Sequence, residues 1–82
     1  MGTSIQKIVK EVQKLQSEED IKDFLLGVLT PGEIEEIAQR IEIVKMLKQG
    51  VNQHDVAAKL GVGVATVTRG SKELKLGRFK TV

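Results

Sequence analysis

Apolar residues recur every three or four positions through most of the chain, a spacing that predicts amphipathic helices and no strands. The pattern predicts a first helix over residues 4–16 that begins at Ser4. One side of this helix is apolar, and the opposite side carries lysines and glutamines. Ser17 is a good cap for a second helix, because the acidic residues of its first turn meet the positive end of the helix dipole. A membrane-surface helix is the alternative for residues 4–16, but the apolar side of this helix has no aromatic residue, so we predict a partner-facing or coiled helix there.

A longer central helix is predicted over residues 31–49. Thr30 can cap this helix, Pro31 fits its first position, and Glu33 completes a capping box. Gly50 is expected to end the helix in the left-handed conformation. The whole pattern predicts one all-α domain of about five helices over residues 1–82, with a poorly ordered tail at residues 77–82.

Residues 52–76 have the pattern of a helix-turn-helix, in which two short helices bury each other around a tight turn. Asn52 can cap the first helix, Ala57 is small where the helices cross, and Gly61 can take the positive φ of the turn. Apolar residues stand where the two helices and the turn meet the core, at Val56, Leu60, Val62 and Val67. A helical hairpin that only packs a protein core is the alternative.

The second helix of such a unit lies in the major groove of DNA. Threonine and alanine can meet thymine methyl groups, arginine can donate a forked pair of hydrogen bonds to guanine, and lysine can neutralise phosphates. The predicted DNA-binding residues are Gln53, His54, Val64, Ala65, Thr66, Thr68, Arg69, Lys72 and Lys75.

The distribution of charge agrees with a nucleic-acid surface. The net charge is only +2, yet residues 1–36 hold 4 basic and 8 acidic residues, whereas residues 37–82 hold 9 basic and 3 acidic residues.

The chain has no cysteine and one histidine, so disulfides and zinc cannot stabilise so short a domain, and oligomerisation is the remaining route. No nucleophile elbow or phosphate loop is present, which argues against an enzyme. No apolar run is long enough to cross a membrane and no signal peptide is recognisable, so we expect a cytoplasmic protein.

Three segments resemble the tryptophan repressor family: L-T-P-G-E at 29–33, A-Q-R-I-E-I-V at 38–44, and above all G-V-G-V-A-T-V-T-R-G-S at 61–71. The resemblance implies an intertwined all-helical homodimer in which residues 4–29 are dimerisation helices. It also implies that two helix-turn-helix units read successive major grooves of operator DNA, and that L-tryptophan is the corepressor. No other cofactor and no metal is expected.

The same resemblance implies a ligand site. Arg40 and Arg69 look like the two arginines that sandwich the indole ring, and Gly70 looks like the glycine that lets the ring lie close. Leu29 and Thr30 look like a pocket wall from the partner subunit. Glu73 stands where the family has a serine that helps to hold the ligand's ammonium group.

Several alternatives stay open from the sequence. Arg40 could instead pair with Glu36 one helical turn away. Glu73 could hold the ammonium group, or pair with Arg69 or Arg40 and close the pocket. Gly70 indicates either a close approach to the backbone or an early helix end. A regulator without an amino-acid ligand and a protein-interaction module are the competing functions.

Overall fold

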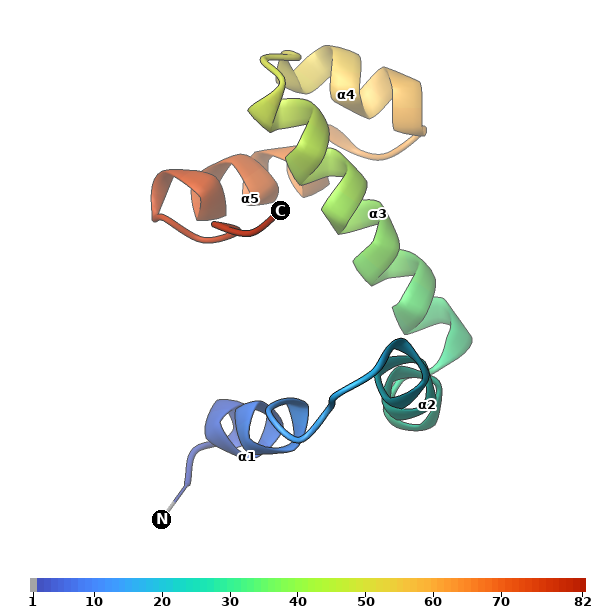
Figure 1. The fold of residues 1–82 in the computed structure, drawn as a ribbon. Coiled ribbons are helices and arrows are strands. Elements are labelled where there is room, and N and C mark those ends of the chain that lie inside the picture. The colour runs from blue at the N-terminus through green and yellow to red at the C-terminus, as the bar shows by residue number, and fades with distance from the viewer. Residues whose placement is uncertain (1) are drawn as a thin grey trace. The chain divides into compact units, whose positions relative to one another are not determined.

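The computed structural model describes residues 2–82, and within that range the chain forms five helices and no strand, α1 to α5 (Figure 1). The predicted all-helical fold class is confirmed. The chain divides into two compact units, Met1–Ile34 and Glu35–Val82, and the boundary lies within the third helix. Met1, which the predicted domain includes, lies outside the described residues.

The first unit contains α1 (Ser4–Val12) and α2 (Glu18–Val28). The cap of α1 is Thr3 rather than the predicted Ser4, because the Thr3 hydroxyl accepts the N–H of Gln6 while the Gln6 side chain accepts the N–H of Thr3. Ser17 caps α2 as predicted, and its hydroxyl accepts the N–H of Asp20 at 3.0 Å. The first helix ends at Val12, earlier than the predicted residue 16.

Neither α1 nor α2 has a buried side chain in the single chain. The apolar side of α1 is between 45% and 64% exposed at Ile5, Ile8, Val9 and Val12. Ile21, Leu25, Leu26 and Val28 of α2 are exposed as well. The apolar faces that the sequence predicts are therefore present, and they are left uncovered within one chain.

The third helix, α3 (Pro31–Lys48), begins at the predicted capping box. The Thr30 hydroxyl accepts the N–H of Glu33 at 3.2 Å, and the Glu33 carboxylate accepts the N–H of Thr30 at 2.9 Å. These bonds satisfy backbone donors that have no partner inside the helix. Two residues after α3 ends, Gly50 has the predicted positive φ of 90°.

The second unit is built on the helix-turn-helix, which the structure confirms as α4 (Gln53–Leu60) and α5 (Val64–Lys75). In Figure 1 both helices lie beside the C-terminal half of α3. The Asn52 side chain accepts the N–H of Asp55, and Gly61 has a φ of 65° at the turn. The core cluster combines Ile43, Val56, Ala57 and Val67, with Met46, Leu47, Val51, Leu60 and Val62 packed against it.

The segment after α5 folds back toward α3. The Lys48 ammonium group donates to the main-chain oxygens of Phe79 and Val82. The N–H of Arg78 donates to the Glu73 carbonyl at 3.0 Å. Residues 77–82, which local composition predicts to be poorly ordered, thus have a defined course that depends on a contact with a distant helix.

Candidate nucleic-acid interface and ligand pocket

The outer side of α5 presents most of the residues that the sequence assigns to DNA. A helix places residues three and four positions apart on one side, and this side carries Val64, Thr68, Lys72 and Lys75. Ala65 and Arg69 lie beside that row, and a shallow depression runs between the two rows. Val67 points the other way and is fully buried. The buried side of α5 therefore fixes the helix on the unit, while its polar side faces solvent.

Two of the predicted DNA-binding residues touch each other across the helix-turn-helix. The Thr68 hydroxyl lies 2.9 Å from the Gln53 side-chain oxygen and 2.9 Å from the Val64 carbonyl, so it can donate to either. Both Thr68 and Gln53 are partly buried. When Thr68 donates to Gln53, the amide nitrogen of Gln53 stays available to contact DNA.

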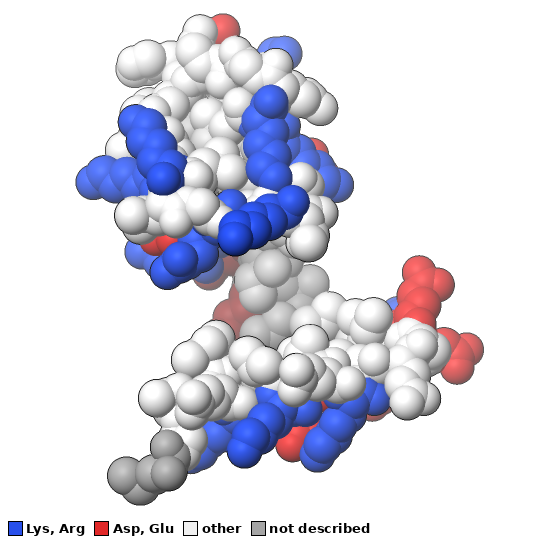
Figure 2. Space-filling model, turned by 60° about the vertical axis from the view of Figure 1, so that its left-hand side comes forward, with Lys and Arg blue, Asp and Glu red and all other residues white. Residues whose placement is uncertain are grey.

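Positive charge predominates on the second unit. Residues 35–82 hold 9 Lys and Arg against 5 Asp and Glu, and Figure 2 shows blue side chains spread over the visible face of this unit with little red between them. His54, at the start of α4, is exposed. A surface of this sign attracts phosphates.

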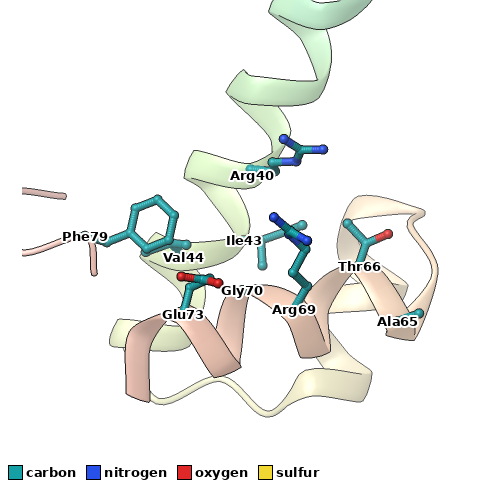
Figure 3. A pocket seen from close by; sticks show the side chains of 9 residues that line it. All are labelled: Arg40, Ile43, Val44, Ala65, Thr66, Arg69, Gly70, Glu73 and Phe79. Carbon is teal, nitrogen blue, oxygen red and sulfur yellow. The ribbon is translucent and has the colours of Figure 1, made fainter. Parts of the chain in front are cut away.

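Behind the outer side of α5 lies a pocket of about 270 Å³ between α3, α5 and the tail (Figure 3). Its apolar floor is formed by Ile43 and Val44 of α3. The arginine side chains of Arg40 and Arg69 lie on one side of the view, and Glu73 and Phe79 lie on the other. The full lining is Arg40, Ile43, Val44, Ala65, Thr66, Arg69, Gly70, Glu73 and Phe79.

The charged groups of the pocket pair differently from the alternatives that the sequence left open. Among the described residues no ion pair joins Arg40 to Glu36, and none joins Glu73 to Arg40 or Arg69. Glu73 instead lies 3.6 Å from the Arg78 guanidinium of the tail. The guanidinium groups of Arg40 and Arg69 are thus not neutralised by a carboxylate from the described part of the chain.

Gly70 lies inside α5, which continues to Lys75, so the glycine does not mark an early helix end. A Cβ atom at this position would meet Ile43 Cγ2 at 3.3 Å and Leu47 Cδ1 at 3.8 Å. The glycine therefore allows α3 to approach α5 closely. Gly70 also forms part of the pocket wall.

The remaining residues of the predicted ligand set lie in the first unit. Leu29 follows the end of α2, and Thr30 caps α3. The resemblance assigns both to the pocket of a partner subunit, and that assignment stays a prediction. The structure adds five residues to the predicted ligand set: Ile43, Val44 and Phe79, which the sequence analysis assigned to no site, and Ala65 and Thr66, which it assigned to DNA. The helical periodicity could have indicated the first two as core residues, but no local signal marks Phe79.

Comparison with known proteins decides the family. The family described as Trp repressor protein matches residues 3–80, nearly the whole chain. The chain belongs to the Trp repressor family. A Trp operon repressor homolog of Vibrio vulnificus (strain YJ016) is 45% identical over 76 residues, which cover 90% of this chain and 74% of the relative.

More distant members of the Trp repressor family match over a similar span. The Trp operon repressor homolog of Vibrio cholerae is 39% identical over 71 residues, 85% of this chain and 69% of the relative. The homolog of Xylella fastidiosa (strain M23) is 33% identical over 78 residues, 94% of this chain and 85% of the relative. No solved structure matches the chain significantly.

Membership of the Trp repressor family makes the chain a transcription regulator of the repressor type and not an enzyme. None of the helices in the described range, residues 2–82, is long and apolar enough to cross a membrane.

Proposed function

We propose that this protein represses transcription by binding operator DNA as a homodimer, with L-tryptophan as its corepressor. The observation that carries the proposal is the position of Arg69, whose side chain borders both the outer depression of α5 and the pocket behind it. A ligand held in the pocket therefore touches a residue that also faces DNA. Such a regulator acts in the cytoplasm, where its operator lies.

The DNA-binding part of the proposal rests on the outer side of α5. Thr68, Arg69 and Lys72 offer a hydroxyl, a forked donor and a point charge, which suit base edges and phosphates. Gln53 and His54 stand at the start of α4, where flanking contacts are made in helix-turn-helix complexes. Val64, Ala65 and Thr66 supply apolar contacts for thymine methyl groups.

The homodimer part of the proposal rests on the uncovered apolar faces of α1 and α2. A single chain of 82 residues buries only five side chains among the described residues, all of them in the second unit. A second copy of the chain is the partner best suited to cover the apolar residues of the first unit, because the relatives' family assembles as dimers. The two α5 helices of a dimer would then enter major grooves about 34 Å apart.

The ligand part rests on the charges and walls of the pocket. Two free guanidinium groups suit the carboxylate and the ring of an aromatic amino acid, since a guanidinium plane both binds a carboxylate and stacks on an aromatic face. The carboxylate of Glu73, which lines the pocket beside Arg78, can accept hydrogen bonds from the ammonium group of the same ligand. Tryptophan is the corepressor in the Trp repressor family, which supports it as the ligand here.

Salt dependence tests the DNA-binding part. Labelled duplexes selected from a random pool are titrated with the protein and L-tryptophan between about 50 and 200 mM salt, where a DNA binder loses affinity steeply. Lys72→Ala is expected to lower the slope of log affinity against log salt by about 1, because one phosphate contact is lost. Lys59→Ala, an exposed lysine of α4 outside the proposed interface, is the matched control. No binding to any duplex at low salt would refute the proposal in favour of a protein-interaction module.

Ligand binding can be measured without a label. The chain has no Trp and no Tyr, so added L-tryptophan reports its own binding through fluorescence anisotropy. A saturable rise at micromolar protein supports the corepressor. No rise at millimolar protein would leave a DNA-binding regulator that has no amino-acid ligand.

A further inference from the structure

The tail contributes an aromatic ring to the pocket. Phe79 lies three residues after Leu76, the C-terminal capping residue of α5. Its ring lines the pocket beside Val44 and Glu73 (Figure 3). Phe79 is one of only two phenylalanines in the chain and is partly buried. The rest of the aromatic content, Phe24, belongs to the first unit.

The backbone at Phe79 is held in an uncommon conformation. Its φ is 61°, and within residues 2–82 no other residue besides glycine has a positive φ. Phenylalanine has no side-chain hydrogen bond that favours this conformation locally, so the surrounding contacts must hold it. Lys48 binds the carbonyl of Phe79 itself, and Arg78 is joined to Glu73 both through its main chain and through its side chain.

We propose that Phe79 adds to the selection of an aromatic ligand, by forming the wall of the pocket that lies across from Arg40 and Arg69. This inference rests on the proposed function, since it assigns a role within the same ligand site. Arg40 and Arg69 bind the carboxylate that all amino acids share, and their guanidinium planes can also stack on an aromatic ring from their side of the pocket. The Phe79 ring recognises the side chain, which differs among amino acids.

The size of the pocket favours contact between Phe79 and a ligand of this class. The free space of about 270 Å³ exists with the ring in place, so Phe79 lines the pocket and does not fill it. That space is near the lower end of small-molecule sites, which begin at roughly 300 Å³. An amino acid with a fused aromatic ring would occupy much of this space, which brings its ring close to Phe79. Aromatic pairs gain from offset or edge-to-face contact beyond the area that they bury, so the ring favours an aromatic side chain over an aliphatic one.

The decisive experiment is an NMR titration of protein labelled with carbon-13 at phenylalanine only. Two sets of ring signals are expected, and Phe79→Leu identifies which belongs to Phe79. Added L-tryptophan is expected to shift the Phe79 signals and to give a nuclear Overhauser effect between them and the indole protons. A saturated complex in which the indole protons show no such effect to Phe79 overturns the inference.

Affinities of variants supply a second readout that a purely structural role would not move. Phe79→Ala is expected to weaken the binding of L-tryptophan by about tenfold. The binding of L-leucine, measured by competition, should weaken by less than about threefold. The ratio of the affinity for L-tryptophan to that for L-leucine should therefore fall. Phe79→Leu should lie between. Leu76→Ala changes an exposed residue of the same segment outside the pocket and is the matched control. An unchanged ratio in Phe79→Ala, with wild-type helicity by circular dichroism, overturns the inference.

The two levels of the proposal fail in different ways. If wild-type protein does not bind L-tryptophan, the corepressor assignment and the role of Phe79 fall together. If wild-type protein binds L-tryptophan and the Phe79 variants bind it with unchanged selectivity, only the role of Phe79 is wrong.

Discussion

Thr68 Oγ1 lies 2.9 Å from Gln53 Oε1, and this contact joins the first residue of α4 to the middle of α5. The two residues are fifteen positions apart and both are predicted to contact DNA. The bond therefore ties the orientations of two side chains that are predicted to contact DNA. Preorganised groups bind with a smaller entropic cost, so the contact should matter for affinity as well as for stability.

Replacing Thr68 with valine tests this contact. The substitution keeps the shape of the side chain but removes the hydroxyl, so the contact with Gln53 and the local bond to the Val64 carbonyl are both lost. We expect the free energy of unfolding to fall by about 1 kcal/mol and DNA affinity to weaken by about three- to tenfold. Thr66→Val removes a hydroxyl that has no hydrogen-bond partner among the described residues. It should lower the free energy of unfolding by less than Thr68→Val in the same urea titration. Equal losses in both variants would show that the Gln53 contact contributes nothing.

Replacing Gly70 with alanine tests the close packing of α5 on α3. Alanine favours a helix over glycine by about 1 kcal/mol, which alone would stabilise α5. The new Cβ would lie 3.3 Å from Cγ2 of Ile43, whose side chain is only 1% exposed and has little room to move. Overpacking of this kind costs about 1–3 kcal/mol, so we expect a net loss of about 1 kcal/mol in urea unfolding at fixed protein concentration. A gain in stability would mean that α3 and α5 move apart readily.

Replacing Ile8 with glutamate tests the proposed dimer. Ile8 lies in the middle of the apolar side of α1, and a charge there could not be buried against a second chain without a large desolvation cost. We expect the dimer to dissociate at concentrations at which the wild type stays dimeric, as measured by sedimentation equilibrium. Lys7→Glu introduces the same side chain on the polar side of α1 and should leave the dimer intact. A wild-type protein that sediments as a monomer would contradict the dimer itself.

The capping box of α3 should make its stability depend on pH. The hydrogen bond from the N–H of Thr30, which is the larger cause, and the bond with the Thr30 hydroxyl, which is the smaller one, hold the pKa of Glu33 below the ordinary value for glutamate. The ionised carboxylate therefore stabilises the fold above the pKa of the unfolded chain, and the contribution is lost as the pH falls through the lower, folded pKa. A carbon-13 titration should place the Glu33 midpoint lower in the folded protein than in urea. Glu33→Gln keeps an acceptor and should remove this part of the pH dependence.

Replacing Lys48 with methionine tests what holds the tail. Methionine keeps the length of the side chain but cannot donate to the carbonyls of Phe79 and Val82. We expect faster hydrogen exchange at residues 78–82 and weaker binding of L-tryptophan, in the same direction as Phe79→Ala. Lys45→Met, nearly one turn earlier on α3, is the control. Unchanged exchange in Lys48→Met would show that other contacts hold the tail.

Most of the fold could be predicted because its signals are local. The bonds that start α2, α3 and α4 join residues three positions apart, Ser17 to Asp20, Thr30 to Glu33 and Asn52 to Asp55. Helical periodicity and a glycine at the turn were sufficient for the helix-turn-helix. Two adjacent hydroxyl residues made the start of α1 ambiguous, and the side chain of Gln6 decides in favour of Thr3.

The course of the tail could not be predicted in the same way. Lys48 and Phe79 are 31 positions apart, and no pattern in residues 77–82 indicates that their carbonyls meet a lysine of α3. The pairing of Glu73 with Arg78 is local by contrast, because the chain reverses after α5 at Gly77, which has a φ of 90°, and the N–H of Arg78 donates to the Glu73 carbonyl. Long-range contacts between polar groups leave no periodic signal in a single sequence.

The shared position of Arg69 has a thermodynamic consequence. If a ligand in the pocket raises the affinity for operator DNA by some factor, operator DNA must raise the affinity for the ligand by the same factor. The protein bound to its operator would therefore keep its ligand at concentrations at which free protein releases it. Promoters already repressed would respond later to a falling ligand supply than the unbound pool does.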